Sequence, residues 1–326
     1  MTKKLLWIIF AGILLGYTGS GAALTRIKLG VATKPGAAPN IVAEKFKELI
    51  EQGSEGDISV QVFHSKSIGN ETEILQQLQT NTVQMGIITA GAFDAFDPIV
   101  RVLNYPFLFK DNEQVDRILD GPLGSKILKS LERAEFKGLS FSENGFVDLT
   151  NNKRSIKTPD DLRGLKIRVE ASALHKTIWR AWGANPVTMP WPIFSELEQG
   201  VIDGQESPLW VIGAYKFYEI QKYLTLTRHI YSPHIDVASL KWWKTLDAKT
   251  KDLIQKTIYE AAVFQRHDNR SKNDARLSFF KEKGMQIEVH PDIDAFRAKV
   301  AGLIDTDLYS EPRVKAMLIE MINATQ

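Results

Sequence analysis

Residues 26–33, Arg-Ile-Lys-Leu-Gly-Val-Ala-Thr, read as a β-strand and begin the pattern that decides the fold. Apolar residues at helical spacing follow over 41–53, and alternating apolar residues over 58–62 predict a second strand. A further helix over 70–78 and a strand over 84–89 complete the run. This β-α-β-α-β order predicts an α/β fold, with a mostly parallel sheet covered by helices on both faces.

A second alternating unit begins near Gly138. Its helix-start signal is Thr158-Pro159-Asp160-Asp161, which offers a capping side chain, a proline at the first helical position and an acid in the first turn. A strand is predicted over 165–169 and a helix over 171–182, and residues 203–208 (DGQESP) read as a polar turn. The chain has 326 residues, of which 44% are hydrophobic, and this is enough for two domains with a core in each.

One long helix is predicted over 247–283, where apolar residues recur three and four positions apart and neither glycine nor proline intervenes. It would be about 50 Å long, more than one small domain spans. Its middle, residues 265–274, is almost wholly polar, so we expect that part to face water on most sides. We therefore expect this helix to run across two lobes.

The N-terminus has the pattern of a secretory signal, with basic residues, an apolar run over 5–17 and small residues up to Ala23. The run spans roughly 20 Å, which is short of the ~30 Å hydrocarbon core, so a signal cleaved after Ala22 or Ala23 is predicted rather than a membrane anchor. Its removal takes away Lys3 and Lys4, and the 41 basic and 39 acidic residues of the chain become balanced. A chain with balanced charge lacks the excess of basic residues that nucleic-acid binding requires. Because there is no cysteine for a lipid tether, we expect a freely diffusing periplasmic protein.

Several kinds of chemistry are excluded by what the sequence lacks. The absence of cysteine rules out disulfides, thiolate nucleophiles, iron–sulfur clusters and cysteine-based zinc sites. The phosphate loop, the Gly-x-Gly-x-x-Gly fingerprint, the Gly-x-Ser-x-Gly elbow and His-Glu-x-x-His are absent as well. Six scattered histidines leave a zinc site of histidines and carboxylates open, and helix capping accounts for Asp160 and Asp161. No cofactor is expected.

Arg168 ends a predicted strand immediately before a helix. Ligands of open α/β sheets bind outside the carboxyl ends of the strands, and a guanidinium there can hold a carboxylate through two parallel hydrogen bonds. A solvated arginine at a strand end is the alternative, which spacing alone does not exclude. Trp191, one of seven tryptophans, follows Met189-Pro190 and is a candidate for a pocket wall.

Several segments resemble the substrate-binding proteins of tripartite ATP-independent periplasmic (TRAP) transporters. They are residues 151–169 (NNKRSIKTPDDLRGLKIRV), 182–190 (WGANPVTMP), 199–208 (QGVIDGQESP), 68–71 (IGNE) with 75–79 (LQQLQ), and 105–109 (YPFLF). The similarity follows the family order over essentially the whole mature chain, and the segment 151–169 is long and specific.

The resemblance implies two α/β lobes, with mixed sheets covered by helices, that are hinged around a cleft and crossed by a long helix. We place residues 1–23 in the signal, 24–146 with 232–272 in lobe I, and 147–231 with 273–326 in lobe II. The family captures organic acids and delivers them to integral membrane subunits driven by a sodium gradient, so a monomeric binding protein rather than an enzyme is expected. A periplasmic sensor that passes its ligand to a signalling receptor would share this fold, and a periplasmic hydrolase or lyase is a third class.

The resemblance also implies the ligand contacts. Arg168 matches the family's most regular contact, which pairs with the substrate carboxylate. Trp191 stands where a phenylalanine usually lines the cleft, and Ser207 stands where an asparagine hydrogen-bonds the carboxylate. The other expected contacts are Glu71, Thr33, Thr89, His234, Met189 and Asp148.

Departures from the family pattern bear on the identity of the ligand. Many relatives carry a second arginine just after the Gly-Phe that matches Gly145-Phe146, where this chain has Val147 followed by Asp148. A second buried carboxylate would lack a partner there, which argues against a dianionic ligand. We therefore expect a monocarboxylate with an apolar or aromatic body, whose amino or hydroxyl group faces Asp148 or Glu71. The alternative is a C4-dicarboxylate or a sugar acid with a different second contact.

Overall fold

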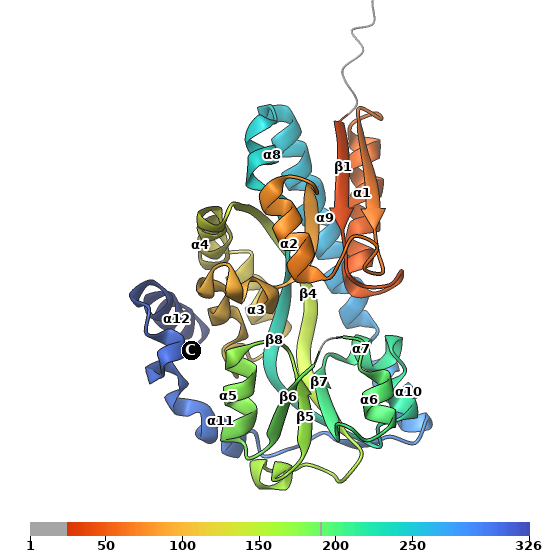
Figure 1. The fold of residues 1–326 in the computed structure, drawn as a ribbon, viewed down its shortest axis with the longest axis vertical. Coiled ribbons are helices and arrows are strands. Elements are labelled where there is room, and N and C mark those ends of the chain that lie inside the picture. Colours follow the sequence, from red (N-terminus) through yellow and green to blue (C-terminus); the bar gives the residue numbers. More distant parts are fainter. Residues whose placement is uncertain (1–24, 190) are drawn as a thin grey trace, which may run out of the picture.

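The computed structural model describes residues 25–189 and 191–326. The predicted signal, residues 1–23, lies outside the described residues, and so does Pro190. One nine-stranded sheet has the order β2-β1-β3-β8-β4-β7-β5-β6, with β9 beside β8 (Figure 1). The predicted α/β fold with mixed sheets is confirmed. Strands β1, β2 and β3 are parallel, as the first unit of the sequence predicts, and β8 runs antiparallel to both β3 and β4.

One end of the sheet, which we call the β1 half, is the predicted parallel unit. Helices α1 and α9 pack together against one of its faces, and α2 covers the other face. The start of α2 is the predicted one, since Asn70 and Glu73 each accept a hydrogen bond from the other's backbone N–H. The bounds are β1 (Thr25–Gly30), α1 (Ala38–Gly53), β2 (Ile58–Phe63), α2 (Glu71–Thr80), β3 (Met85–Thr89) and α9 (Ala248–Ser271).

The other end of the sheet, the β5 half, has β5 (Lys166–Val169) between two parallel neighbours, β6 (Asn185–Thr188) and β7 (Gly204–Ser207). Strand β7 corrects the predicted polar turn over 203–208. Its four residues are all buried, because their polar side chains find partners inside the protein, as the Gln205 amide does on the Thr150 hydroxyl.

Two layers of helices enclose the β5 half. Helix α5 covers one face of the sheet, and α6, α7 and α10 cover the other. Their bounds are α5 (Ala173–Ala181), α6 (Phe194–Glu198), α7 (Leu209–Ala214) and α10 (Asn273–Glu282).

Two long strands connect the halves. Strands β4 (Phe136–Asn151) and β8 (Tyr223–Ser239) run side by side through the middle of the molecule (Figure 1). Their register shifts at three places, and one shift lies between Glu143 and Gly145. Gly145 has a φ of 117°, a conformation that glycine adopts without strain. These irregularities allow one antiparallel ladder to bend where it passes from one half to the other.

The predicted single helix over 247–283 is two helices, α9 and α10, that meet at Lys272. The Asn269 carbonyl explains the break. It accepts a short-range bond from the Lys272 N–H and another from the Arg276 guanidinium, rather than a regular bond one turn later. The pair of helices nevertheless runs from the β1 half to the β5 half, as expected.

One face of the polar middle, residues 265–274, is buried against β4, although four residues of this segment are exposed: His267, Ser271, Lys272 and Asp274. The expectation that this part faces water on most sides missed the buried face. Gln265, Arg266 and Asn269 are each no more than 5% exposed. Gln265 exchanges hydrogen bonds with the backbone of Glu143 at 2.8 and 3.0 Å, and the Asn269 amide donates to the Glu143 carboxylate. Polar side chains can be buried when such partners replace water.

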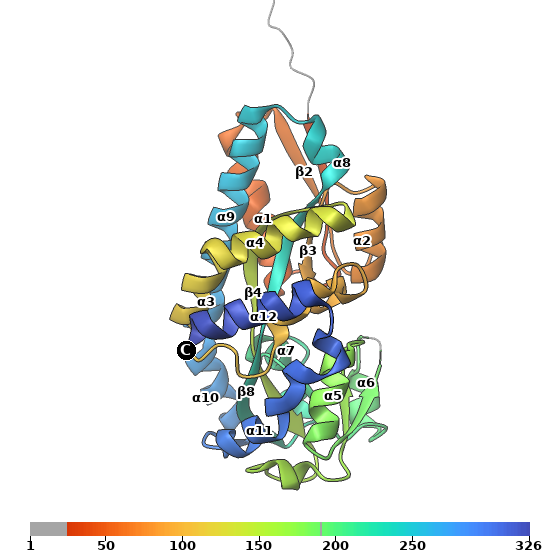
Figure 2. The ribbon, with the colours of Figure 1, turned by 90° about the vertical axis from the view of Figure 1, so that its left-hand side faces the viewer.

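The C-terminal helix α12 (Pro312–Thr325) returns to segments of predicted lobe I. It lies beside α3 (Asn112–Leu119) and α4 (Pro122–Ser130) in Figure 2, and it packs on the 3-10 turn Pro98–Asn104. Helix α12, assigned to lobe II, thus contacts segments assigned to lobe I, and the division into lobes remains a prediction. The remaining elements are α8 (Leu240–Thr245), β9 (Gln286–Glu288) and α11 (Ile293–Val300). Among the described residues, no helix has the length and apolar character needed to cross a membrane.

Candidate functional site

Arg168 lies in β5 on the face covered by α6, α7 and α10, since its strand partner Gln205 is on the same face of β7. The residue is 8% exposed, and its Nε donates to the Met189 carbonyl at 3.2 Å. No ion pair in the described part of the chain neutralises its guanidinium. Burial lowers the pKa of Arg168, while the negative charges of Glu170 and Glu206 oppose that effect. A buried, unpaired guanidinium is suited to bind a carboxylate.

An aromatic wall stands beside Arg168. Its guanidinium lies 5.4 Å from the centre of the Trp191 ring, and Trp191 meets Tyr215 edge to face at 4.8 Å. Phe217 packs behind Trp191 at 5.6 Å. The structure therefore brings together Arg168, Trp191 and the Met189 carbonyl, as the sequence predicts. Their role in ligand binding remains a prediction.

Glu71 and Thr89 meet in the β1 half. A single oxygen of the Glu71 carboxylate, Oε1, accepts from both the N–H and the hydroxyl of Thr89, at 2.9 and 2.8 Å. Burial raises the pKa of Glu71, the Thr89 bonds oppose this, and the charges of Glu170 and Lys66 act in opposite directions. The negative charge of Glu170, in the β5 half, thus acts to raise the pKa of Glu71, in the β1 half.

Two further predicted residues carry polar atoms without a hydrogen-bond partner in the described structure. They are the Thr33 hydroxyl and Nδ1 of His234, and both atoms are buried. His234 lies opposite Thr89 in the β3–β8 pair, so the two side chains are on the same face of the sheet. Burial lowers the pKa of His234 to about 3, against a hydrogen bond with the Glu143 backbone, so the ring is neutral at pH 7.

Two lysines of the β1 half reach carbonyl groups of the β5 half. Lys66 Nζ donates to the Trp191 carbonyl and Lys34 Nζ to the Ala214 carbonyl, each at 2.6 Å. The Lys34 ammonium also lies 4.9 Å from the centre of the Tyr215 ring. These contacts hold the loops of the β1 half against the aromatic wall beside Arg168.

Ser207 is buried on the same face of the sheet as Arg168, and its hydroxyl donates to the Gln205 side chain. The neighbouring Glu206 points to the opposite face, as alternation along a strand requires. There its carboxylate contacts Nδ1 of His175 at 2.5 Å, the Trp179 indole N–H at 2.6 Å and Nε2 of His229 at 3.0 Å. This network anchors β7 behind Arg168.

The charges of this network follow from its geometry. Burial favours the neutral forms, but the charge and hydrogen bond of His175 outweigh it and hold the pKa of Glu206 well below its usual range. Burial likewise opposes protonation of His175, yet Glu206 raises its pKa to about 9. Burial lowers the pKa of His229 despite its bond to Glu206. At pH 7 the network is therefore an ion pair of Glu206 with His175, next to a neutral His229.

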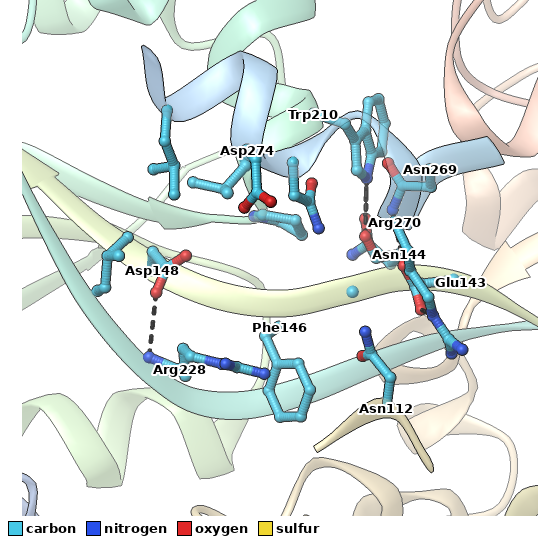
Figure 3. A pocket seen from close by; sticks show the side chains of 16 residues that line it. Asn112, Glu143, Asn144, Phe146, Asp148, Trp210, Arg228, Asn269, Arg270 and Asp274 are labelled. Atoms are coloured by element: carbon cyan, nitrogen blue, oxygen red, sulfur yellow. Dashed lines mark hydrogen bonds and ion pairs between the residues drawn. The ribbon is translucent and has the colours of Figure 1, made fainter. Parts of the chain in front are cut away.

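Asp148 lies opposite Ser207 in the antiparallel β4–β7 pair. It lines a cavity of about 280 Å³ between β4, β8, α7 and the α9–α10 junction (Figure 3). Its carboxylate accepts the backbone N–H of Arg228 at 3.0 Å, and the Arg228 guanidinium lies 4.3 Å from the centre of the Phe146 ring. Burial raises the pKa of Asp148 to about 7 against the bond and charge of Arg228. The role of Asp148 in ligand binding remains a prediction.

The sequence prediction missed Glu170, Tyr215, Lys34 and Lys66. Glu170 had a signal, since it follows Arg168 by two residues and strand alternation puts both on one face. The two lysines had none, because their bonds join segments more than 120 positions apart. Tyr215 had none, because its contact with Trp191 joins two loops that only the fold brings together. In residues 25–189 and 191–326, no group of three or more histidine, aspartate or glutamate side chains is arranged to hold a metal ion.

The comparisons with known proteins agree with this geometry. Residues 31–310 match the family described as "Bacterial extracellular solute-binding protein, family 7" (DctP). The chain is 30% identical over 325 residues, 99% of both chains, to the 2,3-diketo-L-gulonate-binding periplasmic protein YiaO of Escherichia coli K12. A TRAP periplasmic solute-binding protein from Polaromonas sp. JS666, solved with D-erythronate, has a TM-score of 0.86 and 30% identity, covering 91% of this chain and 98% of that one. The sugar acid binding protein DctPAm of Advenella mimigardefordensis, solved with galactonate, has a TM-score of 0.85 and 30% identity, with coverage of 92% and 98%.

The fold and the family match define a solute-binding protein of the kind that serves membrane transport. The chain belongs to the bacterial extracellular solute-binding proteins of family 7, which includes the substrate-binding proteins of TRAP transporters. It is a binding protein and not an enzyme. TRAP solute-binding proteins bind small organic acids and work with membrane subunits.

Proposed function

We propose that this protein binds a sugar acid, a monocarboxylate that carries several hydroxyl groups, and delivers it to a TRAP membrane complex. The observation that carries the proposal is Arg168, a buried guanidinium with no ion-pair partner in the described structure. A ligand carboxylate would supply that partner. The desolvated pair would fix the orientation of the ligand.

The surroundings of Arg168 favour hydroxyl groups on the rest of the ligand. Glu71 and Glu170 lie close enough to each other for their charges to interact. An ionised carboxylate only accepts hydrogen bonds. Hydroxyl groups donate such bonds, whereas an apolar body would leave the carboxylates without partners. The faces of Trp191 and Tyr215 can cover the C–H groups of a sugar acid. The sugar acid, an alternative in the sequence analysis, therefore fits better than the apolar or aromatic body.

Three further proposals concern the state of the protein. The signal is cleaved after Ala22 or Ala23, which leaves a periplasmic protein without a lipid anchor. The protein acts as a monomer. The β1 and β5 halves act as lobes that close on the ligand, and the bonds from Lys66 and Lys34 to carbonyls of the β5 half support this, because opening the lobes would break them.

Isothermal titration and thermal shift with purified protein test the proposal. The acids are D-galactonate, D-erythronate, succinate and phenylacetate, which represent two sugar acids, a C4-dicarboxylate and an aromatic monocarboxylate. We expect a sugar acid to bind, and at about 100 times its Kd it should stabilise the protein by about 2.7 kcal/mol. Binding of succinate or phenylacetate alone would contradict the proposal.

A further inference from the structure

Glu170 and Arg168 frame the same site without neutralising each other. Glu170 follows β5 directly, two residues after Arg168, and its negative charge acts to raise the pKa of Arg168. Arg168 turns its Nε to the Met189 carbonyl, and in the described residues no ion pair joins it to Glu170. The Glu170 side chain has no hydrogen-bond or ion-pair partner in that part of the chain either. A cation and an anion therefore stand side by side, each free to bind a ligand.

Glu170 also reaches the other half of the protein. Its Oε2 would lie only 2.8 Å from a Cβ built on Gly91, so the carboxylate sits directly against that glycine. Glu71 bonds to Thr89, two residues earlier in the same segment. The two carboxylates come from different halves, yet both lie against residues 89–91. The absence of a side chain at Gly91 leaves the space that Glu170 uses.

Two carboxylates over one short segment repel each other when both are ionised, and hydrogen-bond donors to them favour that ionised form. No such donor from the described residues serves Glu170, and Thr89 serves one oxygen of Glu71. We propose that Glu170 and Glu71 together bind neighbouring hydroxyl groups of the sugar acid while Arg168 holds its carboxylate, and that the pair excludes acids with a second carboxylate at that end. The inference rests on the proposed function and names the ligand features that the site selects.

The test compares D-galactonate with galactarate, which has a second carboxylate in place of the terminal hydroxymethyl group. Wild-type protein should bind galactonate and discriminate against galactarate. Glu170→Gln keeps the size of the side chain and removes its charge. It should weaken galactonate binding by about tenfold or more, because a hydrogen bond to a charged group is lost. It should also reduce the preference for galactonate over galactarate by at least the same factor.

A double-mutant cycle with Glu71→Gln tests whether the two carboxylates act as a pair. If they share neighbouring hydroxyl groups, the double variant should lose less galactonate affinity than the product of the two single losses. Glu282→Gln, an exposed site at the end of α10, is the matched control and should leave both affinities unchanged. Melting curves without ligand would show that each variant is folded.

The outcomes separate the inference from the function on which it rests. A wild-type protein that binds no sugar acid would overturn the proposed function, and the inference with it. A wild-type protein that binds galactonate, with a Glu170→Gln variant that keeps the galactonate-to-galactarate ratio, would overturn the carboxylate pair alone. Strictly multiplicative losses in the double variant would likewise count against a shared pair of hydroxyl groups.

Discussion

Replacing Arg168 by methionine should abolish most ligand affinity and yet leave the unliganded protein as stable as the wild type, or more stable. Methionine fills much of the volume of the aliphatic stem and removes the charge. In the unliganded protein Arg168 makes one hydrogen bond, to Met189, and no ion pair with the described residues. Its burial therefore costs free energy that only a ligand carboxylate recovers.

The size of the loss follows from the same burial. Removing one partner of a buried ion pair costs roughly 3–5 kcal/mol, which corresponds to a loss of affinity of between about two and almost four powers of ten. Arg168→Lys keeps the charge but not the planar fork that binds both carboxylate oxygens, so its loss should be intermediate. The buried position, 8% exposed, makes the screening that weakens surface ion pairs small here.

Two measurements check this reasoning. Isothermal titration with D-galactonate gives the affinity, and thermal denaturation without ligand gives the stability. Affinity near that of the wild type in Arg168→Met would refute the assignment of the carboxylate site. A large loss of stability in the unliganded variant would refute the argument that the guanidinium is unpaired.

Three other perturbations have defined outcomes. Lys66→Met and Lys34→Met each remove one hydrogen bond between the halves. At about 1 kcal/mol per bond, each variant should bind the ligand about fivefold more weakly, mainly because stopped-flow traces show faster ligand release. An unchanged release rate would mean that these bonds do not hold the closed state. Glu206 raises the pKa of His175 in the folded protein to about 9, above the value of about 6.5 in the unfolded chain. The ion pair of His175 with Glu206 therefore stabilises the fold fully below about pH 6.5, and this stabilisation, on the order of 3 kcal/mol, is lost as the pH rises toward 9. The urea concentration at the unfolding midpoint should fall over that pH range in the wild type and fall less in His175→Gln. An equal dependence of the midpoint on pH in both proteins would contradict the ion pair. Gly204→Ala places a Cβ 2.2 Å from the Thr150 carbonyl, so the melting temperature should drop by the equivalent of about 1–3 kcal/mol, unless β7 can shift away from β4.

Local signals predicted the elements of the β1 half well. The Asn70–Glu73 capping box and the alternation over 58–62 depend on neighbours in the sequence, so they could be found there. The buried strand β7 and the buried face of the α9–α10 middle could not, because polar residues such as Glu206 and Gln265 signal exposure in a sequence. These side chains can be buried only because partners distant in the sequence form hydrogen bonds with them, as the backbone of Glu143 does with Gln265.

The candidate site shows the same limit. Arg168 stood out because strand ends collect ligands, and the resemblance to a family supplied Trp191 and Glu71. Asp148 was expected near the ligand from its place in the chain; it lines the cavity beside the α9–α10 junction, and its contact with a ligand remains a prediction. The aromatic contact between Trp191 and Tyr215 joins two loops whose approach depends on the packing of α6 and α7.

The long strands β4 and β8 also constrain how the chain can be made. Strand β3 pairs with β8, and α1 packs on α9, so the β1 half needs residues up to Ser271 before it is complete. A ribosome releases the N-terminus first, and domains made of contiguous residues can fold as they emerge. This protein cannot complete its N-terminal half that way. Most of the chain must be available before either half is finished, and a polypeptide that stays unfolded for so long is well suited to being threaded through a narrow channel.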